Sequence, residues 1–187
     1  MVYKIAVLVG SLRKDSLNRK LAKQLVHLAP DSLELKLIDI SDLPVYNSDL
    51  DDEGTVPKPW TRFREEMRAF QGILFVTPEY NRSVPGGLKN AIDVGSRPYG
   101  KSIWQDKPGA IISVSPSSMG GFGANHHLRQ SMVFLNVPIM QQPEAYTGKA
   151  DSLFDENNEI VSEDTRKFMQ SFMIRFSEWV SANAKTE

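Results

Sequence analysis

Three short, uninterrupted apolar runs constrain the fold of this chain more than any other feature of its sequence. They are IAVLV at 5–9, ILFV at 73–76 and most of GAIISV at 109–114. Runs of about four to six residues that are rich in β-branched side chains are typical of strands covered on both faces. The three runs therefore predict the central strands of a parallel sheet with helices on each side.

Two further segments have the character of edge strands. LELKLI at 33–38 alternates apolar and charged residues, and NVPIM at 136–140 contains Pro138. An alternating strand suits a half-exposed edge, and proline cannot donate to a ladder of hydrogen bonds. Together the five segments predict an α/β fold with a doubly wound, five-stranded parallel sheet in the order 2-1-3-4-5.

Helical periodicity fills the intervals between the strands. The predicted helices share apolar residues spaced three or four apart and cover residues 18–28, 58–70, 88–95, 125–135 and about 163–181. Ser162 is a suitable N-cap for the last of them. In that helix a stripe expected to pack in the core consists of Phe168, Phe172, Phe176 and Trp179, backed by Met169 and Met173. Alternating strands and helices place helices on both faces of the sheet, and residues 1–187 are expected to form one domain.

Composition narrows the function classes. The chain has 187 residues, a formal net charge of −1 and no cysteine. The lack of thiols excludes disulfides, thiolate metal sites and thiol catalysis, and a charge near zero gives no field that attracts nucleic acid. The N-terminal apolar stretch is too short for a signal peptide, and no window suits a membrane span. We therefore expect a cytoplasmic protein with no nucleic-acid partner and no membrane span.

The predicted topology locates the functional site, because ligands of such sheets bind beyond the carboxyl ends of the strands where the strand order reverses. The first loop there is GSLRKDSLN at 10–18, which leaves a strand and enters a helix. Free N–H groups at the helix start, the guanidinium of Arg13 and the polar side chains of Ser11, Ser16 and Asn18 suit a terminal phosphate monoester. The alternative is an ordinary turn in which Ser16 or Asn18 caps the helix.

The second loop is TPEYNRSVPGGLKNAID at 77–93. Pro78 and Pro85 stiffen it, and Tyr80 offers an aromatic face. A rigid loop with backbone N–H groups and one aromatic side chain suits edge recognition and stacking of a flat heterocycle. The alternative is that Tyr80 is a surface aromatic in a capped turn.

The third loop is SPSSMGGFGAN at 115–125, which is expected to form a flexible rim of the same site. Its glycines lack the spacing of a dinucleotide fingerprint. His126 and His127, with only His27 elsewhere, are too few for a zinc site. The acidic residues of the 43–60 segment are expected to lie in a solvated loop, so no metal is predicted; they are Asp49, Asp51, Asp52 and Glu53.

Several segments in chain order resemble the motifs of the NAD(P)H-dependent FMN reductases with a flavodoxin-like fold, in the branch of bacterial quinone and chromate reductases. The matching segments span nearly the whole chain and are GSLRKDSLN, DLPVYNSDLD, TPEYNRSVPGGLKNAID, SSMGG and HLRQ at 127–130. The resemblance implies that the FMN phosphate is held by Ser11, Arg13, Ser16, Leu17 and Asn18. It implies that the isoalloxazine is bordered by Pro78, Glu79, Tyr80, Asn81 and Arg82, with Ser115 and Ser118 on the far side.

The resemblance also implies a reaction. Hydride would pass from NADPH or NADH to bound FMN and then to a quinone or a similar acceptor, such as a flavin, an azo compound or chromate. This transfer needs no protein acid or base, so no catalytic residue is named. The dinucleotide phosphates would meet Arg13, Arg82 or Arg97. Relatives generally work as homodimers or homotetramers with FMN near the subunit contact, although GFGANHHLRQ has small or neutral residues where some relatives have charged or phenolic ones.

Two other functions remain open at this point. The first is an electron carrier like flavodoxin itself, which the near-zero net charge disfavours because carriers dock through a strong surface field. The second is a flavin-binding protein that senses redox state or a nucleotide without turnover. The acceptor and the choice between NADH and NADPH are likewise undecided by the sequence.

Overall fold

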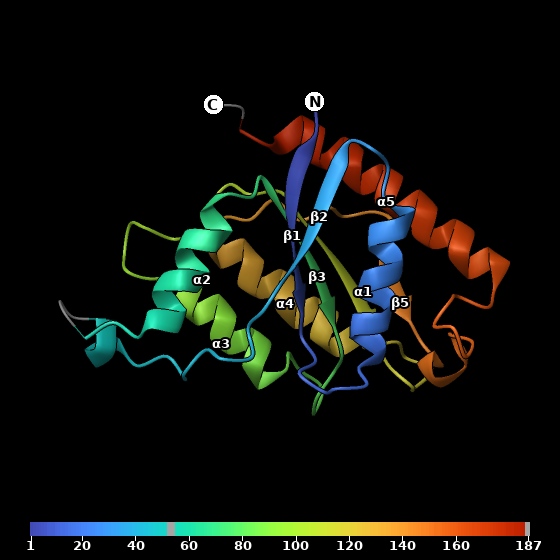
Figure 1. The fold of residues 1–187 in the computed structure, drawn as a ribbon, viewed down its shortest axis with the longest axis horizontal. Coiled ribbons are helices and arrows are strands. Elements are labelled where there is room, and N and C mark those ends of the chain that lie inside the picture. Colours follow the sequence, from blue (N-terminus) through green and yellow to red (C-terminus); the bar gives the residue numbers. More distant parts are fainter. Residues whose placement is uncertain (52–54, 186–187) are drawn as a thin grey trace.

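The structure, a computed structural model, describes residues 1–51 and 55–185. Its centre is a five-stranded parallel sheet in the order β2-β1-β3-β4-β5 (Figure 1). The strands are β1 (Tyr3–Val9), β2 (Leu33–Ile38), β3 (Gly72–Thr77), β4 (Gly109–Val114) and β5 (Ala145–Thr147). The predicted fold class, strand order and three central strands are confirmed.

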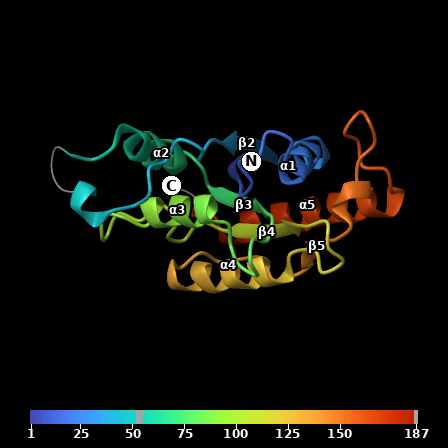
Figure 2. The same cartoon turned by 90° about the horizontal axis from the view of Figure 1, so that it is seen from below.

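Helices cover both faces of the sheet, as predicted. They are α1 (Leu17–Leu28), α2 (Lys58–Arg68), α3 (Gly86–Gly95), α4 (Phe122–Phe134) and α5 (Glu163–Asn183), with short 3₁₀ helices at Ser48–Asp51 and Ala150–Ser152. The sheet passes between α1 and α5 on one side and α2, α3 and α4 on the other (Figure 2). Ser162 caps α5 as expected, because its side chain accepts a hydrogen bond from the N–H of Thr165. Among the described residues no helix is long and apolar enough to cross a membrane.

The alternation of side chains along each strand divides the core into two layers. In β1, Ile5 and Val7 face the layer under α1 and α5, whereas Ala6 and Leu8 face the layer under α2, α3 and α4. Every residue of β3 and β4 is buried, whereas the edge strand β2 is buried only at its ends. The central strands are uninterrupted apolar runs because helices cover both of their faces.

The fifth strand was predicted at the wrong place. Residues 136–140 make only an isolated parallel bridge, between Ile139 and Gly109. The strand that pairs with Ile112–Val114 is β5, at Ala145–Thr147. Pro138 explains the difference, because it has no N–H to continue a ladder and contributes only its carbonyl, which accepts from the N–H of Gly109 at 3.0 Å.

The buried stripe of α5 is also displaced from its prediction. Phe168 is 38% exposed, and the buried residues of this helix are Met169, Phe172, Met173, Phe176 and Val180. One position corresponds to about 100° around a helix, so Phe168 lies at the margin of the stripe that these residues form. Trp179 is half-buried and its Nε1 donates to the carbonyl of Pro138 at 2.8 Å.

The acidic segment before α2 is partly structural. Asp49 is exposed as expected, and Asp52 and Glu53 lie outside the described residues. Asp51 was expected to be solvated, which is wrong. Its carboxylate forms two hydrogen bonds with the guanidinium of Arg64, at 2.7 and 2.9 Å, and both side chains are largely buried.

Candidate functional site

The loops that follow β1, β3 and β4 lie at one edge of the sheet, the lower edge in Figure 1. The first two loops are packed together at Gly10, where a Cβ atom would lie 2.8 Å from Oγ1 of Thr77 and 3.2 Å from Cδ of Pro78. The second and third are joined by Glu79, whose Oε2 accepts from the N–H of Ala124 at 3.0 Å. The structure therefore brings together the three loops that the topology selected.

The turn after β1 presents a helix N-terminus. The Oγ atom of Ser16 accepts from the N–H of Arg19 at 3.1 Å, so the capping role considered for Ser16 is present. That cap leaves the N–H groups of Leu17 and Asn18 without an acceptor in the described part of the chain. Free N–H groups at a helix start and the positive end of the helix dipole are a ready anion site.

The polar side chains of this turn are unusually enclosed. Ser11 and Asn18 are buried, with 3% and 5% exposure, whereas Arg13 is exposed. Oδ1 of Asn18 is buried and has no hydrogen-bond partner among the described residues. Because such an atom is costly to leave unpaired, its position beside free N–H groups indicates that the turn receives a polar ligand. A phosphorylated polyol fits this donor and acceptor set.

Basic side chains surround the outer side of the same turn. A cavity of about 430 Å³ lies between α1 and residues 157–159, and two acidic residues, Asp15 and Glu159, also line it. Its basic lining residues are Lys14, Arg19, Lys20, Lys23 and His27. The excess of positive charge along this side of α1, which includes Lys14 and Arg19 at its start, favours an anionic group nearby.

The loop after β3 is a tight hairpin. Tyr80 and Ser83 exchange two backbone hydrogen bonds of 3.1 and 3.0 Å, and between them Asn81 and Arg82 have φ angles of +50° and +65°. Two central residues with positive φ form the turn type that matches strand twist. Tyr80, Asn81 and Arg82 are exposed and Pro78 is buried. In the described residues the N–H groups of Glu79, Asn81 and Arg82 have no acceptor, so this loop offers donors and one aromatic face at the edge of the site.

Glu79 presents its backbone, and not its carboxylate, to that edge. Its side chain is 13% exposed and its Oε2 accepts from Ala124 in the first turn of α4. The nearest guanidinium nitrogen, Nη1 of Arg82, is 3.8 Å from Oε1. No local pattern indicates this contact, because Glu79 and Ala124 are 45 positions apart.

The loop after β4 is closely packed at Gly120 and exposed at residues 116–119, and the expectation of a flexible rim stays a prediction. Gly120 has a φ of +60°, and a Cβ atom there would lie 2.7 Å from the carbonyl carbon of Tyr146. Ser115 accepts from the N–H of Ser117 at 3.2 Å, and its own N–H donates to Thr147 at 2.9 Å. Ser118 is exposed beside it. The glycines of this loop allow close approach of backbones.

The two adjacent histidines have structural partners. Nε2 of His126 is 2.9 Å from the hydroxyl of Tyr146, and Nδ1 of His127 is 3.0 Å from Oγ of Ser83. Burial, together with Glu144, raises the pKa of Tyr146 to about 12. No group of three or more residues able to hold a metal ion occurs in the described ranges. The contact between Ser83 and His127 joins the loop after β3 to α4, and no pattern in the sequence predicts it.

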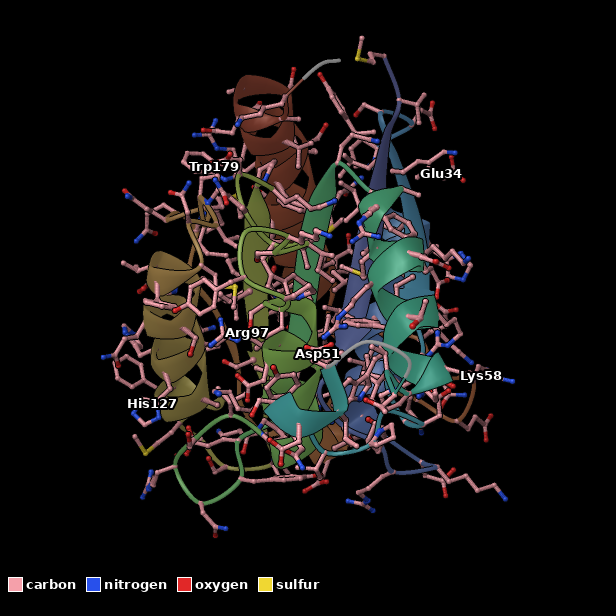
Figure 3. The ribbon with its side chains drawn as sticks, turned by 90° about the vertical axis from the view of Figure 1, so that its left-hand side faces the viewer. Glu34, Asp51, Lys58, Arg97, His127 and Trp179 are labelled. Carbon is pink, nitrogen blue, oxygen red and sulfur yellow. The ribbon has the colours of Figure 1, made fainter. Side chains whose placement is uncertain are left out.

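Arg97 is separate from the other two arginines expected near a dinucleotide. Arg13 and Arg82 lie on the first and second loops, whereas Arg97 follows the opposite end of α3. Its guanidinium lies over the ring of Tyr99 at 4.4 Å, and its charge contributes to lowering the pKa of Asp51, near which it lies in Figure 3. Within one chain, Arg97 therefore lies with Tyr99 and Asp51 near α2 and α3, and not at the three loops.

The parallel sheet in the order 2-1-3-4-5, with an anion-binding turn after β1, defines the class as a flavodoxin-like protein. More narrowly, the chain belongs to the NADPH-dependent FMN reductase family, whose model matches residues 3–152. As a member it is an oxidoreductase that uses FMN as cofactor and NAD(P)H as co-substrate. The predicted family, enzyme class and cofactors are confirmed.

Individual relatives are similar over almost their entire length. A quinone reductase of Pseudomonas putida is 59% identical over 182 residues, covering 97% of each chain. A 2-hydroxy-1,4-benzoquinone reductase of Burkholderia sp. is 47% identical over 180 residues, covering 96% of this chain and 97% of that protein. Among solved structures, FerB, a flavoenzyme NAD(P)H:(acceptor) oxidoreductase from Paracoccus denitrificans, is 40% identical with a TM-score of 0.90, covering 98% of this chain and all of FerB.

Proposed function

We propose that this enzyme is a quinone reductase in which FMN is held by the three loops at the carboxyl edge of the sheet. The observation that carries the proposal is the turn after β1, where neither Oδ1 of Asn18 nor the N–H groups of Leu17 and Asn18 have a partner among the described residues. The names of the relatives from Pseudomonas putida and Burkholderia support a quinone as the acceptor.

The first loop would hold the phosphate and the start of the ribityl chain. The N–H groups of Leu17 and Asn18 donate to phosphate oxygens, with Ser11, Ser16 and the exposed guanidinium of Arg13 around them. Oδ1 of Asn18 is an acceptor, so it suits a ribityl hydroxyl and not a phosphate oxygen. This division of roles uses the free N–H groups at the start of α1 and the Oδ1 of Asn18, which has no partner among the described residues.

The other two loops would border the isoalloxazine. The free N–H groups of Glu79, Asn81 and Arg82 suit carbonyl oxygens and ring nitrogens on the edge of a flavin, and Pro78 and Tyr80 supply apolar surface. Ser115 and Ser118 border the opposite side. When bound, FMN supplies the capacity to accept hydride from a nicotinamide and pass electrons onward. The chain's own contribution is to orient the ring and to leave one face open to both substrates.

No side chain is assigned a proton-transfer role in this proposal, since hydride transfer needs none. Arg13 and Arg82 are exposed at the rim and suit the phosphates of NADPH or NADH. An open rim of this kind also suits flavins, azo compounds and chromate as acceptors. The lack of cysteine is compatible with action in the cytoplasm.

A homodimer or homotetramer is part of the proposal. On α4, Val133 and Phe134 are 79% and 82% exposed, an apolar surface that a second copy of the chain would cover. Sedimentation velocity tests this point. A wild-type dimer or tetramer that dissociates in Val133→Glu/Phe134→Glu supports it, and a wild-type monomer refutes it.

The experiment that tests the function is an anaerobic visible spectrum of the purified, FMN-loaded protein, before and after addition of NADPH and then NADH. Loss of the flavin band within seconds and its return on addition of 1,4-benzoquinone support the reductase. A yellow protein that neither dinucleotide bleaches would instead be a carrier or a sensor. A protein that does not bind FMN would refute the assignment of the three loops.

A further inference from the structure

Three side-chain contacts join the loop after β3 to the loop after β4 and the first turns of α4. Oε2 of Glu79 accepts from the N–H of Ala124 at 3.0 Å, and Oγ of Ser83 lies 3.0 Å from Nδ1 of His127. Nη1 of Arg82 lies 3.3 Å from Sδ of Met119. Figure 3 shows His127 at this end of α4. The two loops proposed to border the isoalloxazine are therefore tied to each other by side chains.

Glu79 makes the most buried of these contacts. The N-cap of α4 is Gly121, whose φ is +77° and which has no side chain to cap the helix. Glu79 supplies the missing acceptor from another part of the chain, and its negative charge lies at the positive end of the helix dipole. Arg82 and Met119 are 75% and 51% exposed, whereas the Glu79 side chain is 13% exposed, so Glu79 holds its position most firmly.

The glycines of GGFG accommodate this contact. A Cβ atom at Gly123 would lie 2.8 Å from the carbonyl oxygen of Arg82 and 2.9 Å from Oε2 of Glu79. At Gly121, a Cβ atom would lie 3.7 Å from that of Glu79. The first turn of α4 thus has no side chain on the surface that receives the β3–α3 loop.

We propose that Glu79 is a positioning residue for the flavin: by binding the N-terminus of α4 it fixes the separation of the two loops that border the isoalloxazine. The inference rests on the proposed function, because it takes the ring to lie between these loops. The same contact directs the carboxylate away from the ring edge. A carboxylate facing the ring would oppose the negative charge that a flavin gains on reduction.

The first test compares Glu79→Ala with Glu79→Gln, which retains an oxygen acceptor, and with Glu65→Ala, which removes an exposed carboxylate from α2. Dissociation constants for FMN come from flavin fluorescence titrations of the apoproteins. We expect Glu79→Ala to weaken FMN binding about tenfold, the effect of losing one charged cap. The dissociation constant of Glu79→Gln for FMN is expected to stay within about threefold of the wild-type value. That of Glu65→Ala is expected to equal the wild-type value. The visible absorption bands of bound FMN are expected to shift in Glu79→Ala alone.

Inorganic phosphate separates positioning of the ring from general loosening of the fold. Phosphate would bind only at the turn after β1, so the rise in melting temperature that it gives the apoprotein should be equal in wild type and Glu79→Ala. If Glu79→Ala bound phosphate and FMN more weakly by the same factor, the inference would be overturned. It would also be overturned if Glu79→Ala bound FMN with wild-type affinity. If the wild-type protein bound phosphate but not FMN, the proposed function would be refuted. That outcome is distinguishable from a failure of the positioning role alone, in which wild type binds FMN.

A second pair of variants keeps the test decisive if Glu79→Ala does not fold. Gly123→Ala favours the helix by propensity yet places a methyl group against Arg82 and Glu79. Its control is Gly86→Ala at the start of α3, where a Cβ atom would have no neighbour within 4 Å. We expect Gly123→Ala to weaken FMN binding about tenfold while Gly86→Ala stays at the wild-type value. Equal FMN affinity in both variants would contradict the positioning role.

Discussion

Asp51 and Arg64 form a bidentate ion pair inside the protein. Nη1 of Arg64 is 2.7 Å from Oδ1 of Asp51, Nη2 is 2.9 Å from Oδ2, and the two side chains are 7% and 11% exposed for Arg64 and Asp51. Nε of Arg64 also donates to the carbonyl of Val94 at 2.8 Å, and the guanidinium lies over Trp60. One arginine on α2 therefore holds both the segment before it and the end of α3.

Loss of Asp51 is expected to destabilise the protein strongly. Asp51→Ala leaves the buried guanidinium of Arg64 without its counter-charge, and breaking such a pair costs about 3–5 kcal/mol. The control is Asp93→Ala, which removes the exposed partner of Lys89 and is expected to change stability by less than about 1 kcal/mol. Urea unfolding of both variants and wild type measures the difference. If the two variants lost similar amounts of unfolding free energy, burial would not be what makes the Asp51–Arg64 pair important.

The same pair predicts an acid dependence. Hydrogen bonds from Arg64 lower the pKa of Asp51 below its ordinary 3.8. A carboxyl with a lowered pKa in the folded state adds stability above its unfolded pKa and loses it as pH falls through the folded value. The cost of Asp51→Asn, measured by urea unfolding, should therefore be constant above about pH 5 and shrink progressively below 3.8. A cost that does not change with pH would contradict this assignment.

The strands that are buried on both faces could be predicted, because their burial requires uninterrupted apolar runs. IAVLV, ILFV and GAIISV are apolar because helices cover both faces of β1, β3 and β4. The edge strand β5 has three residues and no apolar run, so the sequence pattern favours the proline-containing segment before it. Loop positions followed from topology, since parallel strands all end at one edge.

Local caps such as Ser162 could be predicted, but side-chain contacts between distant parts of the chain could not. In the motif DLPVYNSDLD, the N–H of Tyr46 donates to Oδ1 of Asn90 at 2.8 Å across 44 positions. Nδ2 of Asn90 donates to the carbonyls of Leu43 and Pro44 at 3.1 and 3.0 Å. This motif and Asn90 of the β3–α3 motif therefore stabilise each other, which no local pattern could indicate.

Lys107 is expected to give the protein a distinct alkaline response. Burial and then the nearby charge of Arg68 lower the pKa of Lys107 to about 8, and its Nζ donates to the carbonyls of Met67 and Phe70 at 2.9 and 2.7 Å. The unfolded chain titrates near 10.5 and so binds more protons than the folded one between pH 8 and 10.5. The stability contributed by Lys107 is therefore constant below pH 8 and rises between those values.

Lys107→Met isolates this effect from the other groups that titrate at high pH. We expect the unfolding free energy of wild type, relative to Lys107→Met, to rise by about 1–2 kcal/mol between pH 7.5 and 10, allowing for the solvent that reaches the side chain. Urea unfolding across this range measures the difference. A constant difference would mean that the amine titrates at its ordinary pKa in the folded protein, a falling difference would mean that its pKa is raised there, and either would contradict the prediction.

Asn18 provides a test in which stability and ligand binding change in opposite directions. Because Oδ1 of Asn18 is buried and has no partner in the part of the chain that the structure describes, Asn18→Leu removes an unsatisfied acceptor from the apoprotein. We expect the apoprotein to keep its stability or to gain up to about 2 kcal/mol, and FMN to bind at least about tenfold more weakly. The matched control is Gln24→Leu on the same helix, where Nε2 donates to the carbonyl of Asn158 at 3.0 Å. That variant should lose about 1 kcal/mol and bind FMN normally. Urea unfolding of the apoproteins and flavin fluorescence titrations distinguish the two, and an equal loss of stability in both would show that Asn18 is satisfied without a ligand.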